Sequence, residues 1–452
     1  MVLAEAMETS KFEALKDKVW KFMHEHIYPN EQLFAEQNKA MEHLPADQWR
    51  YAPILVELMA EAKKQGLWNL WLPNDTARMA GEGYEGAGLN NEQYAEICEI
   101  LGTSSHMEFA AEATNSSSPD TGNMETIARY GNAEQKAKWL KPLLDGEIKS
   151  AFAMTEPAVA SSDASNISIS IERRGGHYVI NGRKWWITGA GSSHCKIFIL
   201  MGKTDPNAAP FQQQSMILVP ADTPGITIVR PMQTFGDSDA PKGHVEILFE
   251  DVIVPIENVL AGEGKGFEIS QARLGPGRIH HCMRLIGSAE RAIAAMCNRA
   301  ESRVAFGKKL SDFDTILQDI AKCRAELDMA RMLVRQTAHR LDVDGNLKVR
   351  KELSMCKAVV PAVVQQICDR AMQVHGAMGI SQDSFLPMAF SGARWLRFAD
   401  GPDEVHWRTV ARLELRDQKR NKHSLYNLPG YIHRGPVHKR NPPTDPEVLA
   451  KL

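Results

Sequence analysis

The segment YVINGRKWWITG, residues 178–189, marks the middle of the chain as β-structure. Asn181-Gly182 lies between alternating apolar and polar residues, and an Asn-Gly pair in that setting predicts a two-residue hairpin turn. On either side, short apolar runs separated by turn residues predict further strands at 167–171, 196–201, 216–219, 226–229 and 244–249. Short strands with turns between them are typical of a compact all-β unit, either a barrel or a sandwich.

Helical patterns flank this β unit. Up to about residue 148, apolar side chains recur near helical spacing, as at Leu55, Leu58, Ala62 and Leu67. After Gly266 the stripes are longer and keep steps of three and four residues, which predicts an antiparallel helical bundle. One stripe runs through Ile316, Ile320, Cys323, Leu327, Ala330, Val334 and Leu341, and a second through Leu353, Cys356, Val360, Val363, Ile367, Ala371 and Val374.

Composition limits the classes of function. The 452 residues suggest about three domains. A net charge of -3 argues against a nucleic-acid or membrane-surface partner, whose binders carry a basic excess. The longest apolar run, residues 358–364, is far shorter than the ~20 residues that span a bilayer. Seven scattered cysteines without a C-x-x-C motif predict reduced thiols in an intracellular compartment and argue against a structural metal site.

One glycine motif invites a nucleotide-binding interpretation that its context opposes. Gly81, Gly83 and Gly86 match G-x-G-x-x-G. A dinucleotide site needs a strand before the motif in a βαβ unit, whereas the surroundings here are helical. A glycine turn between two helices is therefore the better interpretation.

Three further features have alternative interpretations. The loop TEPAVASS, residues 155–162, could bind a phosphate or a flavin edge, or be an ordinary polar loop. Adjacent Trp185 and Trp186 on a strand should point to opposite faces, so that one packs in the core and the other lines a pocket, unless both are core or interface residues. Asp400, directly before Gly401-Pro402, could be a general base in an apolar pocket or the N-cap of the next helix.

Taken together, collinear segments over about residues 15–420 resemble the acyl-CoA dehydrogenase family, closest to its branch for long or unusual acyl chains. These segments are YEGAGLNNEQYAEICEILG, AFAMTEP with SSD, YVINGRKWWITG, LAGEGKGF, RVAFGKKL, QVHGAMGI and RFADGPDEVH. The resemblance implies an α+β multidomain fold. Its expected parts are an N-terminal helical domain (1–148), a central β-barrel (149–265), a C-terminal four-helix bundle (266–420) and a Pro-rich tail (421–452).

The resemblance also implies FAD as cofactor and acyl-CoA as substrate. The isoalloxazine and ribityl chain would be lined by Phe152, Met154, Thr155, Ser161 or Ser162, Trp186, Ile187 and Thr188. The ADP half would be bound by Arg303, Phe306, Gln373 and Gly376, which in the family come from different subunits, so a homodimer or homotetramer is expected. Pro402, Asp403 and Glu404 would sit against the flavin. The acyl-CoA thioester and pantetheine would contact Ser162, Gly275, Pro276, Gly277, Arg278 and Gly401.

Asp400 occupies the position of the family's catalytic base. The implied reaction is α,β-dehydrogenation of an acyl-CoA to a trans-2-enoyl-CoA in fatty-acid β-oxidation, with electron-transfer flavoprotein or oxygen as acceptor. Most members carry Glu at this position, and an Asp base also occurs in a related oxidase that acts on nitroalkanes. An oxygen-using acyl-CoA or nitroalkane-type oxidase is therefore the alternative function, and a flavin-carrying DNA-associated protein a more distant one.

The last three residues, Ala450-Lys451-Leu452, are similar to the S-K-L peroxisomal address. They predict a peroxisomal location in preference to the cytoplasm or the mitochondrion.

Overall fold

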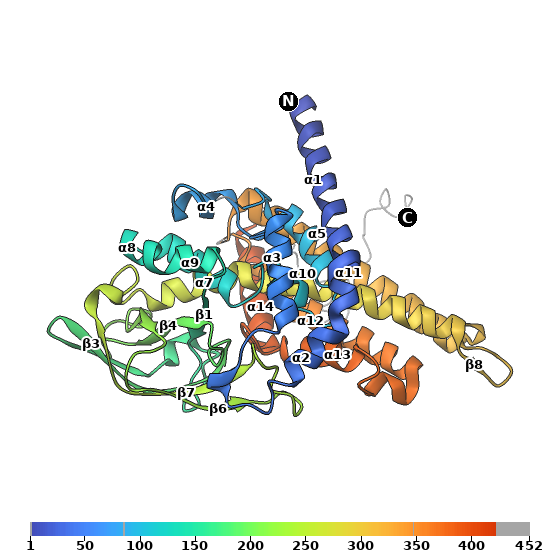
Figure 1. Cartoon of the computed structure of the whole chain (residues 1–452). Coiled ribbons are helices and arrows are strands. Elements are labelled where there is room, and N and C mark those ends of the chain that lie inside the picture. Colours follow the sequence, from blue (N-terminus) through green and yellow to red (C-terminus); the bar gives the residue numbers. More distant parts are fainter. Residues whose placement is uncertain (1, 85, 347, 422–452) are drawn as a thin grey trace, which may run out of the picture.

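Helices make up both ends of the chain and a curled sheet its middle, as Figure 1 shows. The computed structural model describes residues 2–84, 86–346 and 348–421, without the side chains of residues 2–9 and 274–276. This arrangement confirms the predicted α+β fold class. The tail from residue 422, with its expected address at 450–452, lies outside the described residues. None of the described helices combines the length and apolar character needed to cross a bilayer.

The N-terminal part is a set of short helices that share one apolar core with the C-terminal bundle. The helices are α1 (Val2–Phe22), η1 (Met23–Ile27), η2 (Tyr28–Asn30), α2 (Glu31–Lys39), η3 (Ala46–Gln48), α3 (Pro53–Lys64), α4 (Asn74–Ala80), α5 (Asn91–Leu101), α6 (Phe109–Ala113), α7 (Asp120–Tyr130), α8 (Ala133–Gln135), η4 (Lys136–Leu140) and α9 (Lys141–Leu144). Gly81, Gly83 and Gly86 lie between α4 and α5, and no strand precedes them in the described residues. The motif is therefore a connection between helices, as predicted.

The sheet curls into a half-barrel around a core of its own. Its strands are β1 (Lys149–Ala153), β2 (Ser170–Arg174), β3 (His177–Thr188), β4 (Cys195–Lys203), β5 (Gln214–Pro220), β6 (Ile226–Met232) and β7 (His244–Pro255), with short helices η5 (Ala164–Asn166) and η6 (Ile256–Asn258). The strand order is β1-β4-β2-β3-β7-β6, and β5 pairs with β4. Within the described part of the chain, β1 and β6 do not pair with each other, so the barrel stays open. Trp49 from the N-terminal part is fully buried in this core.

The hairpin predicted at Asn181-Gly182 is wrong. Both residues lie inside β3, and the turn between β2 and β3 is Gly175-Gly176 instead. The β3–β7 register shifts at Asn181, whose side chain bonds to Asp251 on β7 at 3.0 Å. Gly182 has φ +145°, and a side chain there would collide with Ile169 at 2.6 Å. The Asn-Gly pair therefore serves a β-bulge, which has the same need for a permissive backbone as a turn.

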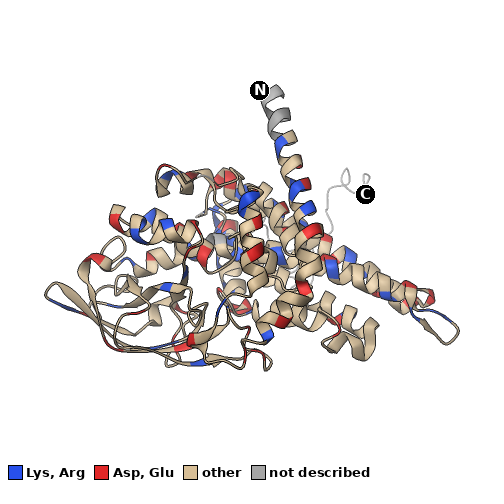
Figure 2. Ribbon diagram, in the orientation of Figure 1, with Lys and Arg blue, Asp and Glu red and all other residues tan. Residues whose placement is uncertain are grey.

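Long helices form the C-terminal bundle. They are α10 (Gly266–Ser302), α11 (Asp314–Asp344), α12 (Arg350–His375) and α14 (Asp403–Arg420), joined by β8 (Val304–Ala305), β9 (Lys308–Lys309), η7 (Leu310–Asp312), η8 (Gly376–Ile380) and α13 (Leu386–Trp395). The two predicted apolar stripes lie on the inner faces of α11 and α12, where most of their residues are buried. Acidic and basic residues are interspersed along the helices in Figure 2. Arg331 on α11, for example, pairs with Glu99 on α5 at 3.0 Å and with Glu290 on α10 at 2.6 Å.

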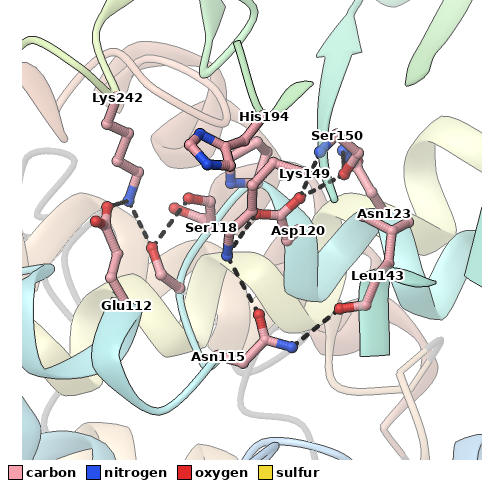
Figure 3. Close-up of polar contacts among 12 residues, drawn as sticks. Glu112, Asn115, Ser118, Asp120, Asn123, Leu143, Lys149, Ser150, His194 and Lys242 are labelled. Carbon is pink, nitrogen blue, oxygen red and sulfur yellow. Dashed lines mark hydrogen bonds and ion pairs between the residues drawn. The ribbon is translucent and has the colours of Figure 1, made fainter. Parts of the chain in front are cut away.

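A buried polar network joins the N-terminal helices to the sheet (Figure 3). Asp120 accepts hydrogen bonds from the Ser150 amide at 2.8 Å and hydroxyl at 2.6 Å, and forms an ion pair with Lys149 at 3.3 Å. Lys242 forms a second pair with Glu112 at 3.0 Å. Two lysines from the sheet side thus meet carboxylates from the helical side, which fixes how the two parts dock.

Candidate active site

The chain turns sharply at Asp400, between α13 and α14. Asp400 has φ +57° and Gly401 has φ +110°. A left-handed φ is uncommon for a residue with a side chain and persists where the surroundings hold it, often at functional sites. The N-cap of α14 is Pro402, which has no side-chain cap bond. The interpretation of Asp400 as an N-cap is therefore wrong.

Helix α10 forms the wall that faces Asp400. Arg278 Nε donates a hydrogen bond to the Asp400 carbonyl oxygen at 3.1 Å, and His406 Nε2 lies 3.2 Å from the same oxygen. The carboxylate oxygen Oδ2 lies 3.5 Å from His281 Nε2, and a Cβ on Gly277 would lie 3.6 Å from it. The Asp400 side chain is 17% exposed. The acid is thus enclosed by α10 with one side still open.

Neighbouring donors and cations dominate the electrostatics of this acid. Burial on its own raises the pKa of Asp400, but the contact with His281 and the charges of Arg273, Lys357 and Arg278 together outweigh it and hold the pKa below its ordinary value. Asp400 is therefore ionised at neutral pH. Burial also lowers the pKa of Lys357, whose Nζ bonds to the Leu396 carbonyl oxygen.

The two segments predicted to face the flavin lie side by side. The Trp185 amide on β3 donates a hydrogen bond to the Thr155 carbonyl oxygen at 3.1 Å, just after β1. Phe152, Met154 and Thr155 are half-buried. The guanidinium of Arg273 on α10 lies 4.1 Å from the centre of the Phe152 ring. The predicted segments therefore make one surface against α10.

A row of rings joins that surface to Asp400. The Trp186 ring lies 5.6 Å from His244, His244 lies 6.1 Å from Trp395, and Trp395 lies 6.4 Å from His281. His281 in turn contacts Asp400. The Trp186 side chain is 39% exposed, which leaves an aromatic face available to a flat ligand. The exposed Trp186 face suits a flat ring such as an isoalloxazine, and the row of rings connects it to Asp400.

The prediction that Trp185 and Trp186 point to opposite faces is wrong. Their ring centres are only 6.4 Å apart, and neither residue belongs to the core of the sheet. The β3–β7 register shifts between Lys184 and Ile187, and Trp186 has φ +55°. This bulge interrupts the alternation of side chains and brings both rings to one side.

Other residues predicted on the flavin side differ in what they can offer. Ser161 Oγ accepts a hydrogen bond from the Glu156 amide at 2.9 Å and is used within its own loop. Ser162 is exposed and has no polar partner in the described residues. The Ile187 side chain is 1% exposed in the sheet core, so only its backbone can face a ligand. Thr188 Oγ1 lies 2.9 Å from His244 Nδ1.

The residues expected to bind the ADP half lie elsewhere. Arg303 and Phe306 belong to the β8–β9 hairpin at the end of α10 that points away from the sheet (Figure 1). From His281 to the end of α10 is about 30 Å at the helical rise of 1.5 Å per residue. Phe306 is 97% exposed, and Gln373 and Gly376 at the end of α12 are also exposed. One chain therefore does not bring these residues to its own flavin surface.

The residues after Asp400 are held within the chain. Asp403 is buried and accepts a hydrogen bond from Arg397 Nε at 2.7 Å, while its Oδ1 is buried without a donor in the described residues. Pro402 is half-buried and Glu404 is exposed. Gly401 packs on His406, because a side chain there would lie 2.9 Å from His406 Nε2. Gly275 and Pro276 belong to α10, but their surroundings lie outside the described set.

Sequence reasoning missed several charged residues of the site. Arg273 and His281 lie on α10 and Lys357 on α12, among many other charged and polar residues of these helices, so the sequence did not single them out. It also missed the buried ion pair between Lys184 on β3 and Glu156 in the 155–162 loop, in which Nζ and Oε1 are 2.8 Å apart. The described residues contain no group of three or more side chains that could hold a metal ion.

Comparison with known proteins gives the chain its relatives. Three family models match: the acyl-CoA dehydrogenase N-terminal domain over residues 9–147, the middle domain over 151–252 and the C-terminal domain over 264–415. The chain is 52% identical to acyl-CoA dehydrogenase family member 10 of Mus musculus, over 90% of this chain and 37% of that protein. It is 51% identical to "Probable acyl-CoA dehydrogenase FadE2" of Mycobacterium tuberculosis, over 88% of this chain and 94% of that protein.

Solved structures agree. A structure from Mycobacterium abscessus, described as a candidate acyl-CoA dehydrogenase, has a TM-score of 0.84 and 45% identity, covering 90% of this chain and 98% of that one. Butyryl-CoA dehydrogenase from Megasphaera elsdenii has a TM-score of 0.73 and 25% identity, covering 89% of this chain and 98% of that one. The chain spans half or less of the length of several curated relatives. It belongs to the acyl-CoA dehydrogenase family, whose members are FAD-dependent oxidoreductases that act on acyl-CoA.

Proposed function

We propose that this chain is an FAD-dependent acyl-CoA dehydrogenase that converts an acyl-CoA thioester to the trans-2-enoyl-CoA, as in fatty-acid β-oxidation. The observation that carries the proposal is the enclosed, ionised Asp400 at the end of a row of rings that begins at the exposed Trp186. An enclosed carboxylate connected to a flat aromatic surface by a row of rings suits removal of a proton next to a carbonyl group.

Asp400 is the proposed catalytic base, which takes the proton from the acyl Cα. The Cα proton of a thioester is a weak acid, so hydrogen bonds to the thioester oxygen must stabilise the developing enolate. The surrounding cations keep Asp400 ionised in the ligand-free protein. An acyl chain that displaces the remaining water would raise the basicity of Asp400 when the substrate is in place.

Bound FAD supplies the acceptor for the β-hydride. We assign its ring system to the surface of Phe152, Met154, Thr155 and Trp186, with Ser162 the better placed of the two serines. We assign its ADP half to Arg303 and Phe306 of one subunit and to Gln373 and Gly376 of another, which makes a dimer the minimum functional unit. The distance of the hairpin from the flavin surface supports this division. The contacts of Pro402, Asp403 and Glu404 with the flavin, and of Gly275–Arg278 and Gly401 with acyl-CoA, also remain proposals.

Three further expectations are part of the proposal. The domain limits at 148/149, 265/266 and 420/421 are supported by the starts of β1 at Lys149 and α10 at Gly266. Electron-transfer flavoprotein or oxygen would reoxidise the flavin. The peroxisomal address at residues 450–452 is a prediction that a fluorescent fusion with and without the tripeptide would test.

The test is anaerobic mixing of the FAD-loaded protein with acyl-CoAs of graded chain length, followed by loss of flavin absorbance. We expect bleaching with at least one thioester. Asp400→Asn should slow bleaching by about 10²–10⁴-fold, the usual contribution of a general base, while FAD stays bound. Asp383→Asn, an exposed acid in the loop before α13, serves as the matched control and should bleach at the wild-type rate.

The same experiment distinguishes the dehydrogenase from the alternative function, an oxygen-using oxidase. Absence of bleaching with every thioester would refute the dehydrogenase proposal, as would full activity of Asp400→Asn. Rapid peroxide formation in air, or bleaching by a nitroalkane, would instead support an oxidase. The carboxylate of Asp400, shorter than the usual Glu, is the feature that keeps this alternative open.

A further inference from the structure

We propose that His281 is a positioning residue for Asp400: its Nε2–H is directed at the Asp400 carboxylate and holds it toward the substrate side. This inference rests on the proposed role of Asp400 as the base. His281 Nε2 lies 3.5 Å from Asp400 Oδ2, with α10 and the turn before α14 supplying the two residues. Catalytic hydrogen bonds are often long in ligand-free structures and shorten in the substrate complex.

The tautomer of His281 follows from its other neighbour. Arg284 Nη2 lies 3.1 Å from His281 Nδ1. A guanidinium can only donate, so Nδ1 must be the acceptor and the proton of the neutral ring must sit on Nε2. Burial, followed by the charge of Arg284, lowers the pKa of His281 to about 4, so the ring is neutral at physiological pH. The only N–H of the neutral His281 ring therefore lies on the nitrogen that is 3.5 Å from Asp400 Oδ2.

Arg284 is fixed in its turn by the N-terminal part of the chain. Its Nε lies 2.9 Å from Glu108 Oε1 in a fully buried ion pair. Glu108 also pairs with Lys242 at 3.2 Å and accepts a hydrogen bond from the Ser117 hydroxyl at 2.8 Å. Lys242 belongs to the polar network between the helices and the sheet (Figure 3). His281 is thus the last member of a buried chain that begins at the domain junction.

The neighbouring histidine does not share this arrangement. His280 is equally buried, at 7% exposure against 6% for His281. Its ring packs against Tyr94 at 4.8 Å, on the side of α5, and it has no contact with Asp400 among the described contacts. His280 and His281 are thus both buried on α10, but only His281 contacts Asp400.

The test replaces His281 by Asn and by Gln, whose amide side chains differ in length. Asn in place of His281 keeps an acceptor near Nδ1 for Arg284 but has no atom near Nε2, whereas Gln reaches the Nε2 position with a donor. We expect His281→Asn to move the acid limb of the pH profile of anaerobic flavin bleaching upward by about one unit. The limiting rate should also fall about tenfold, because the carboxylate is no longer held toward the substrate. His281→Gln should restore both toward wild type, and His280→Asn should change neither.

The acid limb is assigned to Asp400 among several charged neighbours. The charged or titratable groups that face Asp400 or His281 are Arg273, Arg278, Arg284, Lys357, Glu108, Cys282, His280 and His406. All of them remain in the two His281 variants, and His280→Asn tests His280 separately, so a shift confined to His281→Asn belongs to the His281 contact. An unchanged limb in His281→Asn, or no recovery in His281→Gln, would overturn the proposal while leaving the dehydrogenase function intact.

A second measurement needs no substrate. Infrared spectra across the pH range contain the carbonyl stretch of protonated Asp400, identified as the band missing in Asp400→Asn. Its midpoint should lie about one pH unit higher in His281→Asn than in wild type and should be close to wild type in His281→Gln. Equal midpoints would refute the contact even if no acyl-CoA reduced the flavin, so failure of this inference is distinguishable from failure of the proposed function.

Discussion

Replacing Lys184 by Met should loosen the loop that carries the flavin-facing residues. Lys184 is fully buried on β3 and its Nζ makes three contacts: Glu156 Oε1 at 2.8 Å, the Met154 carbonyl oxygen at 2.6 Å and the Met201 carbonyl oxygen at 2.7 Å. Met has similar length and no donor. The substitution therefore leaves the Glu156 carboxylate and two carbonyl groups without their shared partner.

The size of the effect follows from these contacts. Removing one partner of a buried ion pair costs about 3–5 kcal/mol. Glu156 keeps hydrogen bonds from the Ser168 amide and hydroxyl and from the Ile169 amide, which reduce the cost of leaving it unpaired. We therefore expect a loss near the lower limit, about 3 kcal/mol. FAD should also bind more weakly, because Met154 and Thr155 lie in the loop that Lys184 holds.

Urea unfolding followed by tryptophan fluorescence measures the loss, and Arg183→Met is the matched control. Arg183 is adjacent on β3, is 46% exposed and pairs with Glu246 at 2.7 Å. Surface pairs of this kind contribute about 0–1 kcal/mol. The double variant Lys184→Met/Glu156→Gln removes both buried charges and should recover part of the loss. A Lys184→Met protein within about 1 kcal/mol of wild type would refute the reasoning.

Two further predictions concern acid stability and assembly. Burial lowers the pKa of His281 to about 4 and that of His280 and His406 to about 3, so the unfolded chain takes up these protons first as the pH falls below about 6.5. The free energy of unfolding should thus fall as the pH drops from 6.5 toward 4, by about 2 kcal/mol per histidine at pH 5. His106 partly offsets this loss, because Asp239 stabilises its charged form and raises its pKa despite burial. Equal urea midpoints at pH 7 and pH 5 would contradict this prediction. Phe306→Ser should leave the unfolding midpoint of the dilute subunit unchanged, because Phe306 is 97% exposed, but should weaken FAD retention and dimerisation. Sedimentation with flavin absorbance measures both, and an unaltered FAD-loaded dimer would remove Phe306 from the proposed site.

Local patterns predicted the elements of the fold well. The stripes on α11 and α12 are buried as the spacing of apolar residues indicates. The strands expected near 196–201, 216–219, 226–229 and 244–249 all exist. These predictions depend on neighbours in sequence, and periodic burial leaves a periodic trace.

The predictions that failed depend on neighbours across the sheet. Asn181-Gly182 and Trp185-Trp186 both lie where the β3–β7 register shifts. A β-bulge needs the same conformationally permissive residues as a turn, and the residues after it have their side chains on the opposite faces from those that strict alternation predicts. Nothing within β3 alone distinguishes these cases, because the register is decided by the pairing with β7, about 65 residues later in the chain.

The environment of Asp400 shows why a sequence motif can identify a candidate base but not the residues that position it. Asp400 lies in the bundle, His281 and Arg284 on α10, Glu108 in the N-terminal part and Lys242 beside the sheet. Each contact joins residues more than 100 positions apart, except the one between His281 and Arg284. The orientation of the base therefore depends on the docking of all three parts of the chain. A substitution of Lys242 at the domain junction should then alter the chemistry at Asp400 without contacting Asp400. The reason is that Lys242, Glu108, Arg284 and His281 form one continuous buried network, in which each member contacts the next.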